Sequence, residues 1–297
     1  MGGGEPLPDP HSFLSGSRGD PGGPAARLAR RLADRALDLG AARAGARLDA
    51  LAADCPRRDV LVLSVYRPGG DLLPRALDEL RATRHAPRFA LGSMGGPEER
   101  LGEPTAATEL AGGKFENLNA LLERDAGAAA GAGGADWTLV VDDDVELPPR
   151  FLDRMIGVCE RYDLALAQPA QSLASHAAWP VTRRRRGSLL RESRFVEIGP
   201  VTAFRRDALA ELTPFPPLRY GWGLDLHWAA VAESRGWRLG IVDALAVRHE
   251  RGSVAGAYSS RDAIEEARRF LAGRPFLDGA RAQETVRAHP LRGGPGR

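Results

Sequence analysis

The sequence contains little that would tie it to a membrane, to disulfide bonds or to nucleic acid. No stretch approaches the roughly 20 apolar residues of a membrane-spanning helix, and the start, MGGGEPLPDPHSF, lacks the pattern of a signal peptide. The two cysteines, Cys55 and Cys159, cannot build a disulfide framework and match no zinc-binding spacing. A net charge of +2 is too small for a typical nucleic-acid-binding protein. We therefore expect a cytoplasmic protein with no transmembrane segment and no nucleic-acid partner.

Lysine is almost absent as well. Of the 41 basic residues only Lys114 is a lysine, so arginine has been used nearly everywhere that a positive charge is needed. The arginine side chain is wider and flatter than that of lysine, so a single retained lysine suggests a position that requires a compact ammonium group. Chance retention is the alternative.

Apolar runs typical of strands alternate with helical patterns from about residue 59 to residue 250. This alternation predicts one α/β domain with a mostly parallel sheet and helices on both faces. Both ends are rich in glycine and proline, which is typical of disorder. The expected division is a disordered segment over 1–24, a helical extension over 25–55, the main domain over 56–252, a helix over 253–275 and a disordered tail over 276–297. The arginine-rich extension could contact the surface of an anionic membrane.

The sharpest motif is LVVDDDVELPP, in which a buried strand runs directly into three aspartates. Ligands of open α/β sheets bind beyond the carboxyl ends of strands. In an extended chain Asp142 and Asp144 would point to the same side, and two carboxylates held in this way suit Mg²⁺ or Mn²⁺. The alternative is a strand end followed by solvated aspartates in a turn.

Five motifs in the expected order resemble GT-A glycosyltransferases, in particular the large inverting family 2. LVVDDDVELPP resembles the DxD motif that closes a central strand, and GKFENLNALL resembles the Gly-Lys…Asn-Leu-Asn segment ahead of it. FVEIGPVTAFRRDAL and GWGLDLHWA resemble the stretch after the sugar-binding loop and the element that opens the acceptor-side helix. VDALAVRH resembles the late strand that ends in a metal-binding histidine.

The resemblance is closer to a plant family of glycosyltransferase-like proteins that has no settled activity. The matching segments here are LAQPA, GWGLD and the GIVD…RH region that ends at His249. Together the two resemblances cover residues 59–252. They imply a Rossmann-like GT-A fold and a metal-dependent enzyme that uses a nucleotide-sugar donor linked to UDP or GDP. The acceptor is unknown.

The resemblance implies roles on the donor side. Asp144 would bind the metal, Mn²⁺ or Mg²⁺, directly, with Asp142 at the ribose or the metal shell and His249 as a third ligand. A plain surface histidine is the alternative for His249. Lys114 would lie at the phosphates. The remaining nucleotide-binding residues would be Ser64, Tyr66, Arg67, Asn117 and Asp143. An arginine of the basic run at residues 183–186 could bind phosphate.

The acceptor side would depend on Asp225, which follows GWG and would be the general base of an inverting transfer. Asp225 stands at the expected start of a helix, so a helix-capping aspartate is the alternative. The family often has Glu-Asp here, whereas this chain has Leu224 before Asp225, which keeps retaining chemistry open. Glu197 and Trp222 would contact the sugar. Two other functions fit the motifs: a sugar nucleotidyltransferase, or an inactive GT-A-like binding or scaffold protein.

Overall fold

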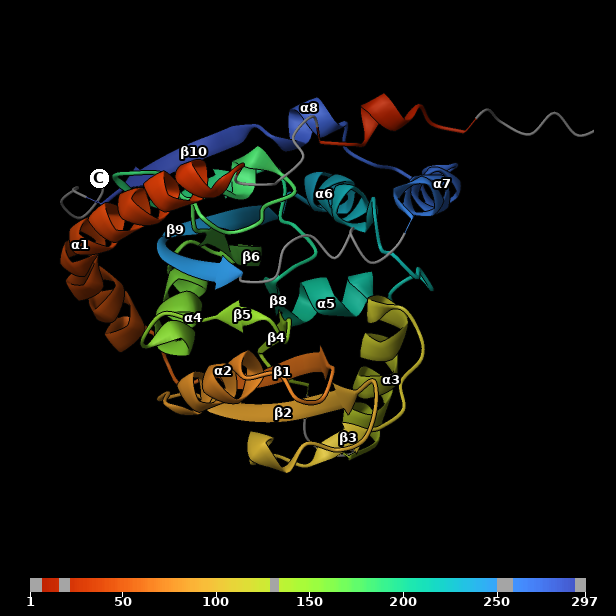
Figure 1. Cartoon of the computed structure of the whole chain (residues 1–297), viewed down its shortest axis with the longest axis horizontal. Coiled ribbons are helices and arrows are strands. Elements are labelled where there is room, and N and C mark those ends of the chain that lie inside the picture. Colours follow the sequence, from red (N-terminus) through yellow and green to blue (C-terminus); the bar gives the residue numbers. More distant parts are fainter. Residues whose placement is uncertain (1–6, 16–21, 129–133, 250–258, 292–297) are drawn as a thin grey trace, which may run out of the picture.

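The computed structural model describes residues 7–15, 22–128, 134–249 and 259–291. Its centre is one sheet with strand order β10-β7-β9-β6-β8-β4-β1-β2-β3, and β5 pairs with β9 outside this path (Figure 1). The strands are β1 Asp59–Tyr66, β2 Ala86–Ser93, β3 Thr105–Ala107, β4 Trp137–Val141, β5 Val145–Glu146, β6 Leu164–Gln171, β7 Ser188–Ser193, β8 Val201–Arg205, β9 Arg238–His249 and β10 Thr285–Pro290. Along the path only β7 and β8, among the described strands, run against the others. The sheet is therefore mixed but mostly parallel, as predicted.

Helices cover both faces of the sheet. They are α1 Pro24–Asp54, α2 Leu72–Arg81, α3 Lys114–Ala128, α4 Phe151–Arg161, α5 Arg206–Leu212, α6 Leu224–Arg235, α7 Ser260–Leu271 and α8 Gly279–Ala282, with 3-10 turns at Pro10–Ser12, Glu99–Leu101 and Pro180–Thr182. Apolar side chains of α1, α2 and α4 build the core on one face, and those of α3, α5, α6 and α7 build it on the other. None of the helices in the described part of the chain is both long and apolar enough to cross a membrane.

The central strands are apolar on both sides because both sides are covered. In β4 the side chains of Trp137, Leu139 and Val141 enter one core and Val140 enters the other. This continuous apolar run is typical of a strand in a doubly covered sheet. It ends where the aspartates begin, so the acidic cluster lies at the sheet edge reached by the carboxyl ends of β1 and β4.

The sequence-based boundaries were wrong at both ends of the chain, within the residues described. The segment predicted to be disordered over 1–24 contains a turn at Pro10–Ser12, and the Phe13 side chain is buried in the core. The tail predicted to be disordered over 276–297 contains α8 and then β10, which pairs with β7. Composition misses such segments because their order comes from long-range partners.

The helical extension is one long helix. The close approach of its C-terminal half to α4 requires Gly157, since a Cβ there would lie 2.8 Å from the Ala52 Cα. Its N-terminal half is tied to the loop after β6: the Asp34 carboxylate accepts the backbone N–H groups of Leu173 and Ala174, each at 2.9 Å. The extension is thus joined directly to the loop that borders the acidic cluster.

Candidate active site

The chain turns at the three aspartates, and their carboxylates have different partners. The strand β4 ends at Val141, and the chain bends at Asp143 and Asp144 before β5 begins. The prediction that Asp142 and Asp144 share a face was based on extended backbone, which does not continue past Val141. The two carboxylates consequently have different partners.

Asp144 meets His249 because β5 pairs with β9. Val145 lies opposite His249 in this antiparallel pair, which brings the histidine beside the preceding Asp144. The Nε2 atom of His249 lies 2.9 Å from Oδ1 of Asp144, and both side chains are largely buried. Burial lowers the pKa of His249, but its hydrogen bond to Asp144 and the nearby carboxylate charges shift that pKa upward overall. The backbone N–H of His249 donates to the Ser175 hydroxyl at 3.0 Å, which fixes the end of β9.

The only lysine pairs with the first aspartate. Lys114 begins α3, and its Nζ atom lies 2.6 Å from Oδ1 of Asp142 and 2.9 Å from the carbonyl oxygen of Ile198. Both charged side chains remain partly exposed, at 29% and 27%. Gly199 closes this arrangement: a Cβ at that position would lie 2.8 Å from Asp142 Oδ2 and 3.0 Å from Lys114 Nζ. The lysine and the aspartate predicted for nucleotide binding therefore form one unit.

We expect Gly199→Ala to disturb this unit. The added methyl group must displace the Lys114–Asp142 pair, and the loss of a partly exposed ion pair costs up to about 1 kcal/mol of unfolding free energy. Gly96→Ala is the matched control, because nothing would lie within 4 Å of a Cβ at that position. Urea unfolding of the two variants measures the difference. Equal stabilities would contradict the close packing described here.

Asp225 and Glu197 form a second acidic group. Asp225 lies in the first turn of α6, is 5% exposed and accepts hydrogen bonds from the Trp179 side chain and, at 3.0 Å, from the Leu226 N–H. Burial and then the charge of Glu197 raise the pKa of Asp225 to about 8. Burial raises the pKa of Glu197 to about 7, although the hydrogen bond from the Ala178 N–H opposes the rise.

Glu197 is partly exposed as a residue, but its Oε2 atom is buried and has no hydrogen-bond partner among the described residues. Its Oε1 atom accepts the Ala178 N–H at 3.3 Å. Ala178 therefore binds the carboxyl group of Glu197, and the next residue, Trp179, binds that of Asp225. The loop after β6 thus supports the whole acidic group.

Other predicted nucleotide-binding residues lie in the core or make contacts within the fold. Ser64 and Tyr66 of β1 are buried, at 0% and 2% exposure, and the Tyr66 hydroxyl bonds with Thr105 Oγ1 at 2.7 Å. Both side chains, which were predicted to bind nucleotide, thus lie inside the core. Arg67 is exposed, and its backbone N–H donates to Asp143 Oδ2 at 2.9 Å, which joins the ends of β1 and β4.

Three further predictions also fall on residues that the fold uses. Asn117 is buried and bonds both the N–H and the C=O of Gly112, so it shapes the loop before α3 instead of facing a ligand. Trp222 is half-buried and packs against the core. In the basic run, the buried Arg184 binds Asp38 of α1 at 2.7 Å, and Arg183 donates to the carbonyl oxygen of Leu173 at 3.0 Å.

Sequence reasoning missed the residues that hold the site together. Trp179 and Ser175 lie in a loop without a recognisable motif, and nothing in their sequence context marks them. Glu266 of α7 accepts the backbone N–H groups of Arg219, Tyr220 and Gly221 and so positions the loop ahead of Asp225. Its spacing on a surface helix is ordinary, so no signal could have found it.

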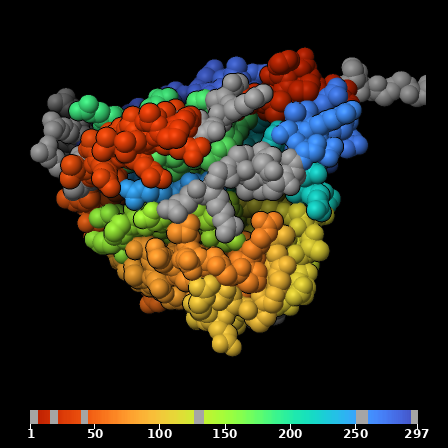
Figure 2. Space-filling model, viewed as in Figure 1, coloured from red at the N-terminus to blue at the C-terminus, as the bar shows by residue number. Residues whose placement is uncertain are grey.

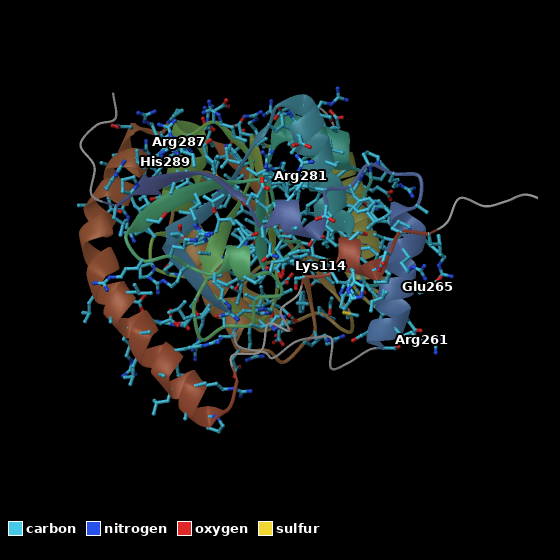
Figure 3. The ribbon with its side chains drawn as sticks, turned by 90° about the horizontal axis from the view of Figure 1, so that it is seen from above. Lys114, Arg261, Glu265, Arg281, Arg287 and His289 are labelled. Carbon is cyan, nitrogen blue, oxygen red and sulfur yellow. The ribbon has the colours of Figure 1, made fainter. Side chains whose placement is uncertain are left out.

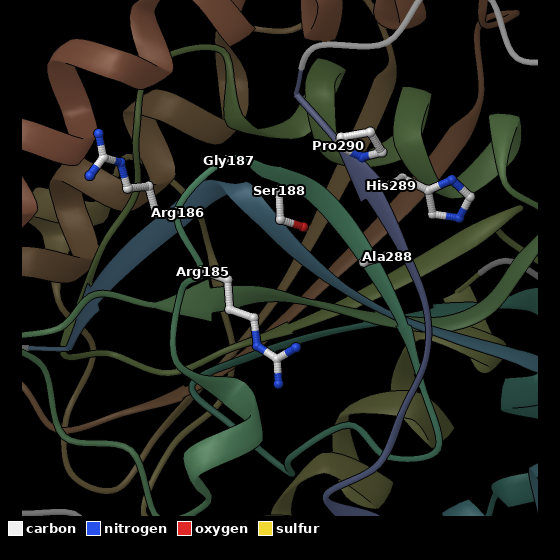
Figure 4. A pocket seen from close by; sticks show the side chains of 7 residues that line it. All are labelled: Arg185, Arg186, Gly187, Ser188, Ala288, His289 and Pro290. Carbon is white, nitrogen blue, oxygen red and sulfur yellow. The ribbon is translucent and has the colours of Figure 1, made fainter.

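A separate groove lies at the sheet edge, between the loop that precedes β7 and strand β10 (Figure 4). It is lined by Arg185, Arg186, Gly187, Ser188, Ala288, His289 and Pro290. None of the residues of the two acidic groups takes part in it. The candidate site, at the ends of β4 and β9 and the start of α6, is therefore distinct from this groove.

No family model matches the sequence, and no curated protein matches it either. Several solved structures are similar to this chain. Residues 1–349 of S. aureus TarS, in complex with UDP-GlcNAc, are 11% identical with a TM-score of 0.51, over 72% of this chain and 65% of that chain. At this identity the likeness shows the fold, and it bears out the predicted GT-A-like architecture.

Two further similar structures have lower TM-scores. The mannosyltransferase PcManGT from Pyrobaculum calidifontis, in complex with GDP-Man and Mn²⁺, is 16% identical with a TM-score of 0.46, over 73% of this chain and 65% of that chain. GalNAc-T7 with UDP, GalNAc and Mn²⁺ is 14% identical with a TM-score of 0.46, over 66% of this chain and 44% of that chain. This chain thus spans less than two thirds of each of these three proteins.

Proposed function

We propose that this protein is a metal-dependent glycosyltransferase that moves a sugar from a nucleotide-diphosphate donor to an acceptor hydroxyl with inversion. The observation that carries the proposal is the meeting of Asp144 with His249 beside the Lys114–Asp142 pair. Residues far apart in the chain converge there on one edge of a GT-A-like sheet. The likeness to TarS, whose structure contains UDP-GlcNAc, supports the substrate class, and the motif order supports an affinity with inverting family 2 and the plant family.

Asp144 and His249 are the residues that would hold the metal. Their side chains already touch, and they offer one oxygen and one nitrogen donor. Among the residues that the structure describes, no three His, Cys, Asp or Glu side chains form a complete metal cluster. Two protein ligands fit Mg²⁺ or Mn²⁺ at a phosphate-binding site, where substrate phosphates and water fill the other positions. When bound, the ion supplies positive charge for the diphosphate leaving group.

Lys114 provides the fixed positive charge on the donor side. Its ammonium group is held by Asp142 and by the Ile198 carbonyl oxygen, and it remains partly open to solvent. A phosphate oxygen that approached it would form a charge-assisted hydrogen bond without any need to order the side chain first. We assign Asp142 to the positioning of this lysine and of the donor.

Asp225 is the proposed general base. It would take the proton from the acceptor hydroxyl while the hydroxyl oxygen bonds to the anomeric carbon. The bond from that carbon to the diphosphate breaks on the opposite side, and the nucleoside diphosphate leaves with the electron pair. A carboxyl group whose pKa is raised to about 8 by burial and by Glu197 is a stronger base than an exposed aspartate. Glu197 would keep that pKa high.

Thermal unfolding with nucleotides tests the proposal. We expect UDP or GDP to stabilise the chain in the presence of Mn²⁺ and not in its absence, whereas CMP and ADP should have no effect. A ligand at about 100 times its dissociation constant adds about 2.7 kcal/mol of stability, which is readily detected.

The outcome also separates the alternatives. Stabilisation by a nucleoside triphosphate together with a sugar 1-phosphate, but not by UDP or GDP, would favour a nucleotidyltransferase. If no nucleotide stabilised the chain with or without metal, the proposed function would be wrong and a binding or scaffold role would remain.

A further inference from the structure

The N-terminal half of α1 presents an apolar and basic surface to solvent. Leu28, Leu32 and Leu39 are 60%, 55% and 79% exposed, and they are three of the most exposed large apolar side chains in the described residues. Leu32 and Leu39 follow Leu28 by four and eleven residues, or about one and three helical turns, so the three lie in one line. Isolated exposed leucines are ordinary, but a line of three on one helix is a surface that needs an explanation.

Arginine flanks this line. Arg31 and Arg35 follow Leu28 by three and seven residues, which places both exposed side chains on the same side of the helix as the leucines. We call these five residues, Leu28, Arg31, Leu32, Arg35 and Leu39, the Leu–Arg face. Figure 2 shows α1 in red to orange on the surface of the molecule, and Figure 3 shows it along one side of the domain.

The acidic residues of this half-helix are used elsewhere. Asp34 is buried against the N–H groups of Leu173 and Ala174. Asp38 binds Arg184 at 2.7 Å and Arg248 at 3.0 Å. Both carboxylates therefore compensate charge within the domain, and the Leu–Arg face keeps its positive charge.

We propose that the Leu–Arg face docks onto a membrane surface that contains anionic lipids. A helix that lies in the interface buries its apolar side chains among the acyl chains, while its arginines reach the lipid phosphates. The charge of the face complements such a surface. It opposes pairing with a second copy, because Arg31 and Arg35 would then approach the same cations of the partner.

The helix that carries the Leu–Arg face is also linked to the candidate active site. The Asp34 contact fixes α1 to the loop after β6, and the same loop holds His249 through Ser175 and Asp225 through Trp179. The inference does not depend on the proposed function, because it follows from the surface of α1 alone.

Vesicle flotation of the full chain, without nucleotide, tests the docking. We expect binding to vesicles of phosphatidylcholine with 30% phosphatidylglycerol, weak binding to phosphatidylcholine alone, and loss of binding at high salt. Removing two arginine contacts in R31Q/R35Q should weaken binding about thirtyfold. The triple variant L28S/L32S/L39S should weaken it at least tenfold, since all three side chains would otherwise enter the interface.

The matched control is V286S/R287Q on β10, where an exposed valine is likewise followed by an exposed arginine. It should bind anionic vesicles like the unchanged protein. Circular dichroism verifies that all variants fold. Failure to bind anionic vesicles, or unchanged binding by both α1 variants, would overturn the proposal. The proposal would also be overturned if light scattering detected a dimer and the L28S/L32S/L39S variant were monomeric. None of these results would alter the nucleotide titration, so the two proposals fail independently.

Discussion

Replacing Asp225 with asparagine is expected to lower kcat by about 10²–10⁴-fold, because a general base contributes an acceleration of that size. Asparagine keeps the shape of the side chain and can still interact with Trp179 and the Leu226 N–H, so donor binding should persist. Steady-state kinetics with the donor identified by nucleotide titration, together with that titration on the variant, measures both quantities.

The control for this substitution is Asp262→Asn. Asp262 occupies the first turn of α7 as Asp225 occupies that of α6, but it is exposed whereas Asp225 is buried. Its replacement should leave kcat unchanged within about twofold. An Asp225→Asn variant with unchanged kcat would remove Asp225 as the base, and Glu197 would then be the carboxyl group to examine.

The same assignment predicts a pH dependence. A general base acts in its ionised form, and the pKa of Asp225 is raised to about 8. The value of kcat/KM should therefore rise with pH and level off above about 8. Glu197→Gln would remove a negative charge near Asp225, lower the pKa of Asp225 and move the rise to lower pH. A structural role of Glu197 alone would reduce activity without moving the profile.

Stability should change with pH in the opposite direction. Both carboxyl groups have folded-state pKa values, about 8 and about 7, above their ordinary values of 3.8 and 4.5. The folded chain therefore holds protons that the unfolded chain has lost. Their contribution to the free energy of unfolding is fully present below about pH 4 and declines as pH rises to about 8.

The second large effect is expected at Asp144. The Asp144→Ala variant should lose the metal-dependent stabilisation by nucleotide, about 2.7 kcal/mol for a ligand at about 100 times its dissociation constant. The reason is that the carboxylate beside His249 would be absent while the other residues of the site remain. Thermal unfolding with the identified nucleotide, with Mn²⁺ or with EDTA, gives the measurement.

Asp143→Ala separates metal binding from the general effect of losing an aspartate in this turn. Asp143 accepts the Arg67 N–H and joins β1 to β4, so its loss should reduce the stability of the unliganded chain. Asp143 was predicted to bind nucleotide, but its carboxylate accepts a backbone N–H instead, so the variant should keep its response to nucleotide and metal. If Asp143→Ala lost the response and Asp144→Ala kept it, the metal assignment would be wrong.

Much of the fold could be predicted from the sequence, because the signals are local. The apolar run from Asp59 to Tyr66 forms β1, and the apolar side chains that recur at helical spacing after Pro149 form α4. A buried strand followed by carboxylates is a local pattern that by itself predicts a ligand-binding edge of the sheet. The chain ends could not be predicted in this way. The order of Phe13 and of β10 depends on partners that are distant in sequence.

By itself, the sequence determined the α/β class, the position of the acidic cluster and the identity of the residues most suited to it: Lys114, Asp142, Asp144, Asp225 and His249. Only the tertiary structure decided which of them meet. The chain turns after Val141, β5 and β9 bring His249 to Asp144, and α3 brings Lys114 to Asp142. Composition and spacing fix what each side chain can do. The partner and the pKa of a side chain depend on distances that exist only once the chain is folded.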